Sequence, residues 1–322
     1  MDLFAPMVQE SAQHPNFRRV LLQPPSHKAV LQQWASGFQD RDNKFVKEFQ
    51  SSFNPCFWEL YIFACLKELR LGVDFTHASP DFVVSSGFLH CSIECVTAQN
   101  AYDKKPEHTL TIEDRLQDLY GPSREDVAYE ATVRLANAIS SKYAYYKKHY
   151  STLAHVRGKP FLLAVAPFEE RYFWIQRLDG ITNVLYQSKL KEVQKKSGAV
   201  IPLGFFLGKS MPEISAVLFS NVATFSKVVA LAQETTTINH FITARHGHQD
   251  LDHYFQNYEE ALLDGLFVMH NPHAMYPVSI LNFQLNGLAQ IYSKGQAIVA
   301  DCPQGYLLER TCFTASPSQQ DG

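Results

Sequence analysis

Residues 80–98 read PDFVVSSGFLHCSIECVTA, two short apolar runs on either side of Ser86-Gly87. The runs 80–84 and 88–97 have the composition of β-strands, and Ser-Gly suits a two-residue hairpin turn. With this turn, Asp81 and Glu94 become diagonal neighbours on one face of the hairpin, roughly 7–8 Å apart at the backbone. The sequence therefore predicts a hairpin that brings two carboxylates together.

Such a pair of carboxylates needs a cation or a proton. Two close anions repel each other and raise one of the two pKa values. Mg²⁺ binds in proteins through one or two carboxylates together with waters and substrate phosphates. The alternative is a solvent-exposed hairpin face, which the surroundings of Glu94 (Ile93, Cys95 and Val96) disfavour because they are apolar. We therefore expect Asp81 and Glu94 to share one metal ion.

A third carboxylate stands alone in an apolar helix. Asn54-Pro55 is a helix start, since Asn caps well and Pro fits the first helical position. Apolar residues nearly all round predict a buried helix over Asn54–Leu71. Glu59 is the only charged residue from Asn54 to Leu66. It therefore either forms a structural salt bridge with a distant Arg or Lys, or faces a cation.

The remaining pattern indicates a mixed α/β protein. The apolar run Phe161–Ala166 is typical of a central strand that is covered on both faces, and Ile214–Phe219 is a further expected strand. Helical spacing predicts helices over about 124–150, 224–232 and 250–263. Residues 1–27 contain four prolines and are expected to be irregular, with helices beginning near Lys28 and covering about 43–49.

These patterns divide the chain into four parts. We expect an N-terminal helical arm over 1–53 and an α/β core over 54–270, built on a mixed central sheet flanked by helices. A C-terminal β extension over 271–313 and a flexible tail over 314–322 follow. The chain of 322 residues is 46% hydrophobic with 23 Phe and 15 Tyr, which is enough for a sizeable core.

Composition excludes several classes of protein. The formal net charge of −3 excludes a globally basic nucleic-acid coat protein but leaves room for a local basic groove. No stretch approaches the 18 apolar residues of a membrane helix, and Met1–Pro6 lacks the basic start and apolar core of a secretory signal. We therefore expect a cytoplasmic protein without a membrane partner, whose six Cys remain thiols. A homodimer or another protein partner is a further option.

The order of these features resembles the core of the PD-(D/E)XK nuclease superfamily, in which a helix bearing Glu precedes a strand opened by Pro-Asp and a strand with Ile-Glu-x-Val. The similarity covers about residues 54–166, extends toward 232, and includes the 13-residue step from Asp81 to Glu94. It implies a restriction-endonuclease-like core in which Asp81, Glu94 and the backbone carbonyl of Cys95 hold Mg²⁺ or Mn²⁺. Glu59 would hold a second ion or a water.

The sequence departs from this superfamily at its lysine, which should stand two residues after Glu94, where this chain has Val96. In the superfamily the Lys also occurs on the next helix, and here that helix carries Arg134 and Lys142 eight residues apart, close to one face. Lys142 is our candidate for the missing ammonium, and Gln99 is a further polar option. The alternative for Lys142 is a solvated helix side chain.

The position of Lys142 on its helix favours the hypothesis that Lys142 supplies the missing ammonium. Val127, Leu135 and Ile139 supply an apolar face at helical spacing, and Lys142 lies three residues beyond Ile139. If that face packs on the sheet, the ammonium lies on or beside it. We therefore expect the Lys142 nitrogen to come near the Asp81–Glu94 pair.

Positive charge is concentrated after the hairpin. Residues 131–168 contain no Asp or Glu, but they contain six basic residues interleaved with four Tyr. Such a segment suits a phosphate backbone, so the candidate nucleic-acid ligands are Arg134, Lys147, Lys148, Arg157 and Lys159. The alternative is a solvated helix end with Lys at the favourable C-terminal pole.

Three other patterns suggest different chemistry, and each is incomplete. The run His246–His253 resembles the H-x-H-x-D-H motif of metallo-β-lactamase-fold hydrolases, but Leu251 replaces the final His, and we favour a polar helix start there. The cysteines near the candidate site form no Cys-x-x-Cys pair for zinc (Cys56, Cys65, Cys91 and Cys95). Gly208-Lys209-Ser210 lacks the upstream Gly of a phosphate loop.

The leading hypothesis is a metal-dependent nuclease that hydrolyses phosphodiester bonds of nucleic acid, with DNA as the expected substrate. Its catalytic residues would be Glu59, Asp81, Glu94 and Lys142, with Lys142 orienting the nucleophile or neutralising charge that develops on the phosphate. If nothing replaces the missing Lys, the same fold would be a catalytically inactive module that binds nucleic acid or a protein partner.

Overall fold

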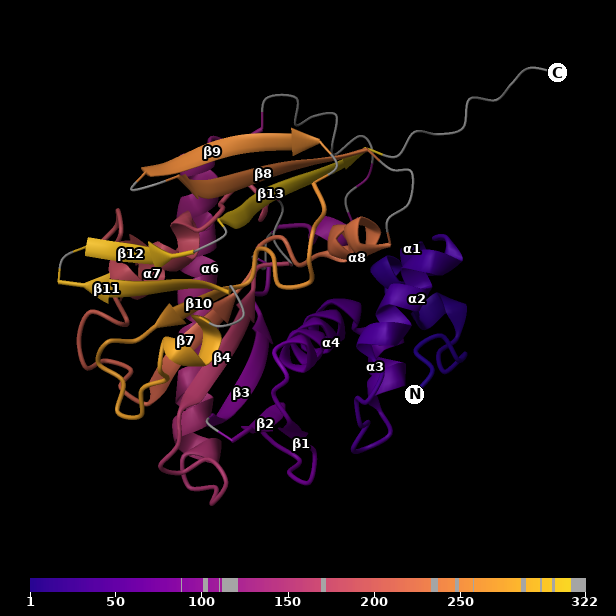
Figure 1. Ribbon diagram of the computed structural model, residues 1–322, viewed down its shortest axis with the longest axis horizontal. Coiled ribbons are helices and arrows are strands. Elements are labelled where there is room, and N and C mark those ends of the chain that lie inside the picture. Colours follow the sequence, from indigo (N-terminus) through magenta and orange to yellow (C-terminus); the bar gives the residue numbers. More distant parts are fainter. Residues whose placement is uncertain are drawn as a thin grey trace.

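The structure is a computed structural model that describes residues 1–87, 89–100, 104–109, 111, 121–168, 172–232, 237–246, 249–256, 258–284, 288–295, 297–302 and 305–313. A mixed eight-stranded sheet of order β1-β2-β3-β4-β7-β10-β11-β12 runs through its centre (Figure 1). Its strands are Val73–Asp74 (β1), Phe82–Ser85 (β2), His90–Thr97 (β3), Phe161–Ala166 (β4), Ile214–Phe219 (β7), Phe267–His270 (β10), Ala289–Lys294 (β11) and Ala297–Asp301 (β12).

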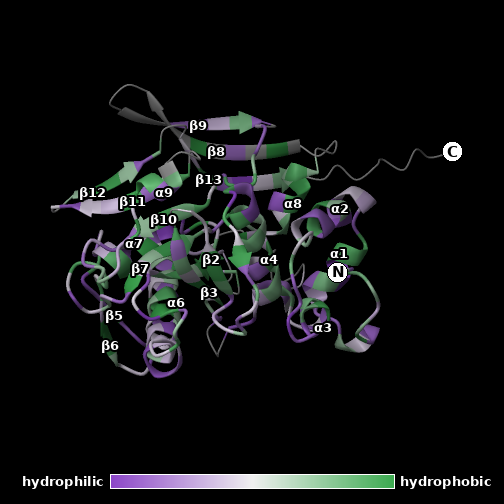
Figure 2. Cartoon of the chain, turned by 60° about the horizontal axis from the view of Figure 1, so that its bottom comes forward, coloured by the Kyte–Doolittle hydropathy of each residue, from purple (hydrophilic) through white to green (hydrophobic). Residues whose placement is uncertain are grey.

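The middle of this sheet is parallel. β3 pairs with β4 and β4 pairs with β7 in the same direction, whereas β2 and β10 run antiparallel to their neighbours β3 and β7. All six residues of β4 and all six of β7 are buried. Their sequences are continuous apolar runs because both faces of the sheet are covered, and Figure 2 shows hydrophobic colour on β7. The two strands have the bounds that the sequence predicted.

Helices cover the sheet on both faces, so the protein is mixed α/β, as the sequence predicted. The helix α4 (Phe53–Glu68) packs on one face, where Leu162 and Ala164 of β4 point. The helices α6 (Arg124–Tyr145) and α7 (Asp179–Tyr186) pack on the other face, against Leu163 and Val165. The indole Nε1 of Trp58 donates to the carbonyl of Ala164 at 2.8 Å and joins α4 to the sheet.

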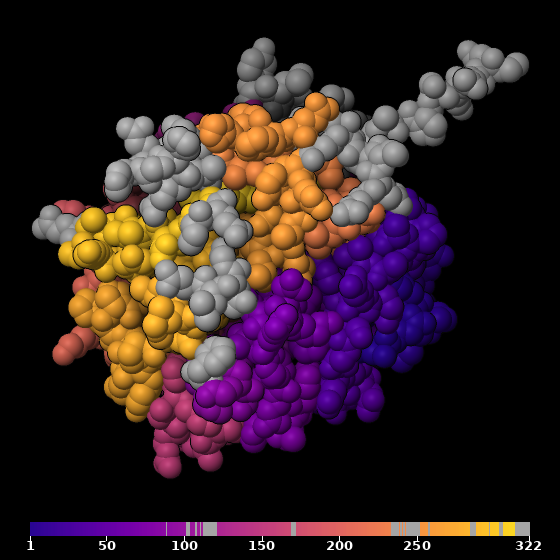
Figure 3. Space-filling model, viewed as in Figure 1, coloured from indigo at the N-terminus to yellow at the C-terminus, as the bar shows by residue number. Residues whose placement is uncertain are grey.

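The N-terminal segment is more helical than the sequence predicted. The helices α1 (Pro15–Leu21) and α2 (Pro25–Trp34) lie partly or wholly inside the stretch 1–27 that we expected to be irregular. That prediction is wrong because Pro15 and Pro25 begin helices, where the fixed φ of proline is favourable. The helix α3 (Phe45–Ser51) agrees with the expected helix over 43–49. Figures 1 and 3 show this segment packed beside α4.

A second sheet has the order β13-β8-β9, with β8 at Thr237–His246, β9 at Gln249–Gln256 and β13 at Tyr306–Phe313. The helix predicted over 250–263, with its polar start, is therefore wrong. The backbone of 249–256 pairs antiparallel with β8, and Tyr254 and Phe255 are residue types that favour strands. The segment expected as a C-terminal β extension, 271–313, contributes β11 and β12 to the central sheet and β13 to the second sheet.

The shorter elements connect these layers. They are η1 (Glu10–Ala12), η2 (Glu107–Thr109), η3 (Tyr146–Tyr150), β5 (Glu192–Gln194), β6 (Val200–Pro202), α8 (Phe225–Leu231) and α9 (Leu281–Gln284). The helix α8 agrees with the one expected over 224–232. Within the ranges given above, none of the helices has the length and apolar character needed to cross a membrane. The expected tail 314–322 lies outside the described residues.

Candidate functional site

The strands β2 and β3 form the predicted antiparallel hairpin, but their register differs from the prediction by two residues. Ser85 pairs with His90 and Phe82 with Ile93, so the connection is residues 86–89 and not Ser86-Gly87 alone. Phe88 in this connection lies outside the described residues. A shift by two residues keeps every side chain on its face. One step beyond the paired residues, Asp81 therefore lies opposite Glu94 and not diagonal to it.

The side chain of Asp81 hydrogen-bonds the part of β3 that extends beyond its pairing with β2. Because β2 begins at Phe82, the amide of Cys95 has no strand partner there, and it donates to Asp81 Oδ2 at 2.7 Å. Burial and the negative charge of Glu94 raise the pKa of Asp81 to about 7, against the opposing effects of the Cys95 hydrogen bond and Lys142. Asp81 is thus a carboxyl group held in place whose proton is exchangeable near neutral pH.

Glu94 lies in the middle of β3 and is 5% exposed. Lys142 Nζ donates to Glu94 Oε1 at 2.6 Å. The other oxygen, Oε2, is buried and has no hydrogen-bond partner in the described part of the chain. Burial alone would lower the pKa of Lys142, but Glu94 and then Asp81 raise it above its ordinary value. Lys142 is therefore a cation beside two acids.

The helix α6 brings Lys142 to this position. Ser123 caps its N-terminus by accepting from the amide of Asp126 at 3.1 Å. The residues that we expected on the inward face are buried, including Val127, Leu135 and Ile139. Lys142 follows three residues later and reaches across to β3. The approach of this ammonium to the acid pair, expected from helical spacing, is confirmed.

Glu59 projects from α4 into the same electrostatic environment. Burial and the charge of Asp81 raise its pKa well above its usual range, and the positive charge of Arg41 opposes this effect. Glu94 acts on it as well. The structural salt bridge considered for Glu59 would therefore involve Arg41. No ion pair joins these two side chains among the residues that the structure describes.

The three acids do not form one ligand shell. No group of three His, Cys, Asp or Glu side chains in the described ranges is arranged to hold a metal ion. We predicted that Glu59, Asp81 and Glu94 converge on one ion, and the structure corrects this prediction. The three carboxyl groups interact electrostatically but do not surround one ion together. One oxygen of Glu94 is taken by Lys142, and one of Asp81 by the Cys95 amide.

The pair Asp81–Glu94 by itself fits a divalent cation. It offers a buried carboxylate oxygen without a partner, Glu94 Oε2, and a second carboxyl whose pKa is raised by burial and by its neighbour. A cation would give Glu94 Oε2 a partner and would stabilise the charged form of Asp81. Mg²⁺ needs only one or two carboxylates when waters and phosphate oxygens complete its shell. Asp81 and Glu94, with the carbonyl of Cys95, would hold Mg²⁺ or Mn²⁺ here.

Two residues beside this site were not predicted from the sequence. Arg41 lies in the N-terminal segment and donates to the carbonyl of His77. Tyr150 ends η3 and is buried, and burial together with the charges of Glu94 and Asp81 raises the pKa of its hydroxyl. No local pattern relates Arg41 to the hairpin, whereas the run of tyrosines around Tyr150 was interpreted only as nucleic-acid surface.

Four of the five candidate nucleic-acid ligands follow the C-terminal end of α6 along the chain, whereas Arg134 lies in the middle of that helix. Lys147, Lys148 and Arg157 are exposed, while Lys159 and Arg134 are half-buried. Lys147 Nζ lies 5.2 Å from the centre of the Tyr143 ring. The π-helix η3 carries Lys147 and Lys148 between Lys142, which donates to Glu94, and Tyr150, whose hydroxyl is influenced by the charge of Glu94. The exposed Lys147 and Lys148 thus closely follow the lysine that contacts the acid pair.

The cysteines and the histidine run do not build a metal site within the described ranges. All six Cys are free thiols. Burial raises the pKa of Cys65 and of Cys91 to about 12, which keeps them protonated. The run His246–His253 falls on the hairpin of β8 and β9, and its Gly247 and His248 lie outside the described residues.

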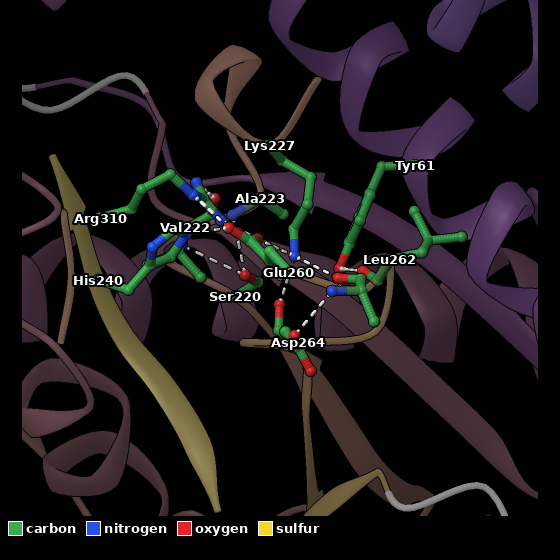
Figure 4. Close-up of polar contacts among 11 residues, drawn as sticks. Tyr61, Ser220, Val222, Ala223, Lys227, His240, Glu260, Leu262, Asp264 and Arg310 are labelled. Carbon is green, nitrogen blue, oxygen red and sulfur yellow. Dashed lines mark hydrogen bonds and ion pairs between the residues drawn. The ribbon is translucent and has the colours of Figure 1, made fainter. Parts of the chain in front are cut away.

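A separate charged cluster lies in the interior between α8 and the second sheet, and no local pattern in the sequence predicted it. Figure 4 shows Lys227, His240 and Arg310 around Glu260. Lys227 and Arg310 form ion pairs with Glu260, and His240 Nε2 lies 2.9 Å from Glu260 Oε2. Lys227 also donates to the carbonyls of Ala261 and Asp264 at 2.9 and 2.7 Å. His240 Nδ1 has no hydrogen-bond partner among the described residues, and we interpret this ion-paired network as structural.

Comparison with known proteins gives no match to this chain, whether with family models, with curated proteins or with solved structures. Its function therefore has to be inferred from the arrangement of its own side chains. Among the arrangements described above, the acid pair with Lys142 has the most groups that could bind a cation or transfer a proton.

The raised pKa of Asp81 predicts how the metal-free protein responds to pH. The folded state holds this proton up to about pH 7, whereas the unfolded state releases it near pH 4. The folded state then binds more protons, so the contribution of Asp81 to the free energy of unfolding falls as pH rises from about 4 to about 7. Urea unfolding in EDTA across this range should show the fall in wild type and a smaller one in Asp81→Asn. Equal slopes in both proteins would contradict the assignment.

Proposed function

We propose that the protein is a metal-dependent nuclease that hydrolyses phosphodiester bonds of nucleic acid, with DNA as the expected substrate. The observation that carries the proposal is the ion pair of Lys142 with Glu94 beside the half-buried Asp81. It supplies a cation at the place where Val96 leaves the PD-(D/E)XK motif incomplete. The order of α4, the hairpin β2–β3, α6 and β4 supports a restriction-endonuclease-like core.

Each residue has a distinct role in this proposal. Asp81 and Glu94 hold Mg²⁺ or Mn²⁺, which when bound stabilises negative charge on the reacting phosphate. Lys142 neutralises charge that develops on the phosphate or orients the attacking water. Glu59, whose pKa is raised by burial and by Asp81, exchanges a proton with a nearby water. Lys147, Lys148 and Arg157 bind the phosphate backbone from their exposed positions.

The test is cleavage of a panel of labelled single- and double-stranded DNA and RNA by the full chain, in Mg²⁺, in Mn²⁺ and in EDTA. The proposal predicts cleavage of at least one nucleic acid in the presence of metal and none in EDTA. The second candidate is a catalytically inactive module of the same fold, which Val96 favours. Binding without cleavage of any substrate would support that module and contradict the nuclease.

Replacing Lys142 separates catalysis from binding. Lys142→Met keeps the apolar stem and removes the cation, so kcat should fall by about 10²–10³-fold, the effect of one lost electrostatic contact to the transition state. Lys148→Met, on the exposed turn η3, is the matched comparison. It should raise KM and reduce the salt dependence while kcat stays within a few-fold of wild type. Steady-state kinetics at several salt concentrations measures both, and an unchanged kcat in Lys142→Met would eliminate the role of this lysine.

A further inference from the structure

A second potential binding site lies at the carboxyl ends of the central strands. A cavity of about 490 Å³ is bordered by α1, the first turns of α4, the start of α8, β13, and the segments that follow β4 and β7. Small-molecule sites typically have volumes of about 300–1,000 Å³, and ligands of open α/β sheets bind beyond the carboxyl ends of strands. The cavity is distinct from the acid pair, since none of the four candidate catalytic residues lines it.

The walls of this cavity are rich in aromatic side chains. Six aromatic residues line it, and they come from three separate segments of the chain: Phe53, Phe57, Phe168, Phe173, Trp174 and Phe225. Trp174 is 39% exposed, whereas the other two tryptophans of the chain are buried. Aromatic faces accept flat heterocycles by stacking, with little dependence on which heterocycle it is. The cavity therefore suits a planar ring.

The charge of the lining is entirely positive. It includes Arg19 and Arg310 but neither Asp nor Glu. Arg310 is neutralised by Glu260 behind it. Arg19 donates to Asn16 Oδ1 at 2.9 Å and to the carbonyl of His108 at 3.2 Å, both neutral, and it forms no ion pair with a carboxylate among the described residues. Its charge is thus available to an anion at the mouth of the cavity.

The wall also contains a hydrogen-bond acceptor that the protein leaves unused. Asn221 is fully buried, and its Nδ2 donates to the carbonyls of Trp174 and Leu308, each at 3.2 Å. Its Oδ1 has no hydrogen-bond partner within the described ranges. A buried acceptor without a donor is costly. This oxygen has almost no accessible surface, so a ring N–H of a ligand would reach it only after the Asn221 side chain shifts toward the cavity.

We propose that this cavity binds a nucleotide, with its base between the aromatic side chains and its phosphate at Arg19. A base supplies the planar ring and the ring or amino N–H groups, and the phosphate supplies the negative charge that the lining lacks. The nucleotide is either a free mononucleotide or an unpaired nucleotide of a nucleic acid. The proposal does not depend on the nuclease activity, because it uses neither the acid pair nor a metal.

The test measures binding in EDTA by calorimetry and by fluorescence of Trp174, the exposed tryptophan. The probes are AMP, GMP, CMP and UMP, inorganic phosphate, and a short duplex with one unpaired 3′ nucleotide. We expect at least one probe that carries a base to bind and to quench the fluorescence, at least tenfold more tightly than phosphate. A duplex that binds tenfold more tightly than every mononucleotide, and loses this advantage in Trp174→Ala, would identify nucleic acid as the source, and comparable affinities would identify the free nucleotide.

Variants decide whether the signal comes from this cavity. Trp174→Ala should weaken binding by about 5- to 100-fold, the effect of one lost base–aromatic stack, and Arg19→Gln should weaken it about tenfold. Arg18→Gln, at an exposed neighbour that does not line the cavity, should bind like wild type. The unfolding midpoint of each variant serves as the folding control. Failure of all probes that carry a base, or wild-type affinity in Trp174→Ala and Arg19→Gln, would overturn the proposal.

Discussion

Asp81→Asn is expected to reduce metal-dependent cleavage by about 10³-fold or more, since a catalytic cation contributes several kcal/mol to the transition state. The variant removes the charge that binds the cation. It leaves an amide oxygen in place to accept from the Cys95 N–H, which Asp81 Oδ2 accepts in wild type at 2.7 Å. The fold should therefore survive, and the loss should appear in kcat and in metal affinity. Cleavage measured over a range of Mn²⁺ concentrations separates the two.

The matched control is Asp74→Asn on the neighbouring strand β1. Asp74 accepts only from Thr76 among the hydrogen bonds described, and it lies outside the acid pair. We expect the Asp74→Asn variant to cleave nucleic acid at the wild-type rate. If Asp81→Asn also cleaves at that rate, Asp81 is not a ligand of a catalytic ion.

Glu260→Gln is expected to lower the free energy of unfolding by about 3–5 kcal/mol, because it leaves two buried cations without their counter-charge. The side chains of Lys227 and Glu260 are fully buried, and that of Arg310 is nearly so. Burial alone would raise the pKa of Glu260, but Arg310 and Lys227 hold it far below its usual range. The carboxylate is therefore charged in the folded state throughout the neutral range. Urea unfolding at neutral pH measures the loss.

The adjacent Glu259→Gln is the control, because Glu259 is exposed and its replacement should change the free energy of unfolding by no more than about 0.5 kcal/mol. A similar small change in Glu260→Gln would mean that the cluster contributes little net stability. Since α8, β8, β13 and the segment before β10 meet at Glu260, the larger loss would also identify it as the point that joins the second sheet to the core.

Local patterns predicted the part of the site that depends on periodicity. The alternation along the hairpin β2–β3 placed Asp81 and Glu94 on one face even though the predicted turn was wrong, because a shift of two residues preserves the face. Helical spacing from Ile139 placed Lys142 beside Glu94. The continuous apolar runs of β4 and β7 identified the central strands.

Features that depend on distant parts of the chain could not be predicted in this way. Arg41 reaches the environment of Glu59 from the N-terminal segment, and the partners of Glu260 come from three elements far apart in sequence. The strand β9 was mistaken for a helix because its pairing with β8, and not its own spacing, determines its conformation. Tertiary contacts overrode the local signal in each case.

The most direct test of the central claim is the binding of Mn²⁺ to the full chain, measured by calorimetry near pH 8, where the Asp81 carboxyl is expected to ionise readily. We expect a site in wild type that is lost in both Asp81→Asn and Glu94→Gln and retained in Asp74→Asn. Nucleic acid that carries no cleavable bond should strengthen Mn²⁺ binding, since phosphate oxygens complete the shell of the ion. Equal Mn²⁺ binding by wild type and both site variants, or no binding by wild type with such a nucleic acid present, would contradict a metal site at Asp81 and Glu94.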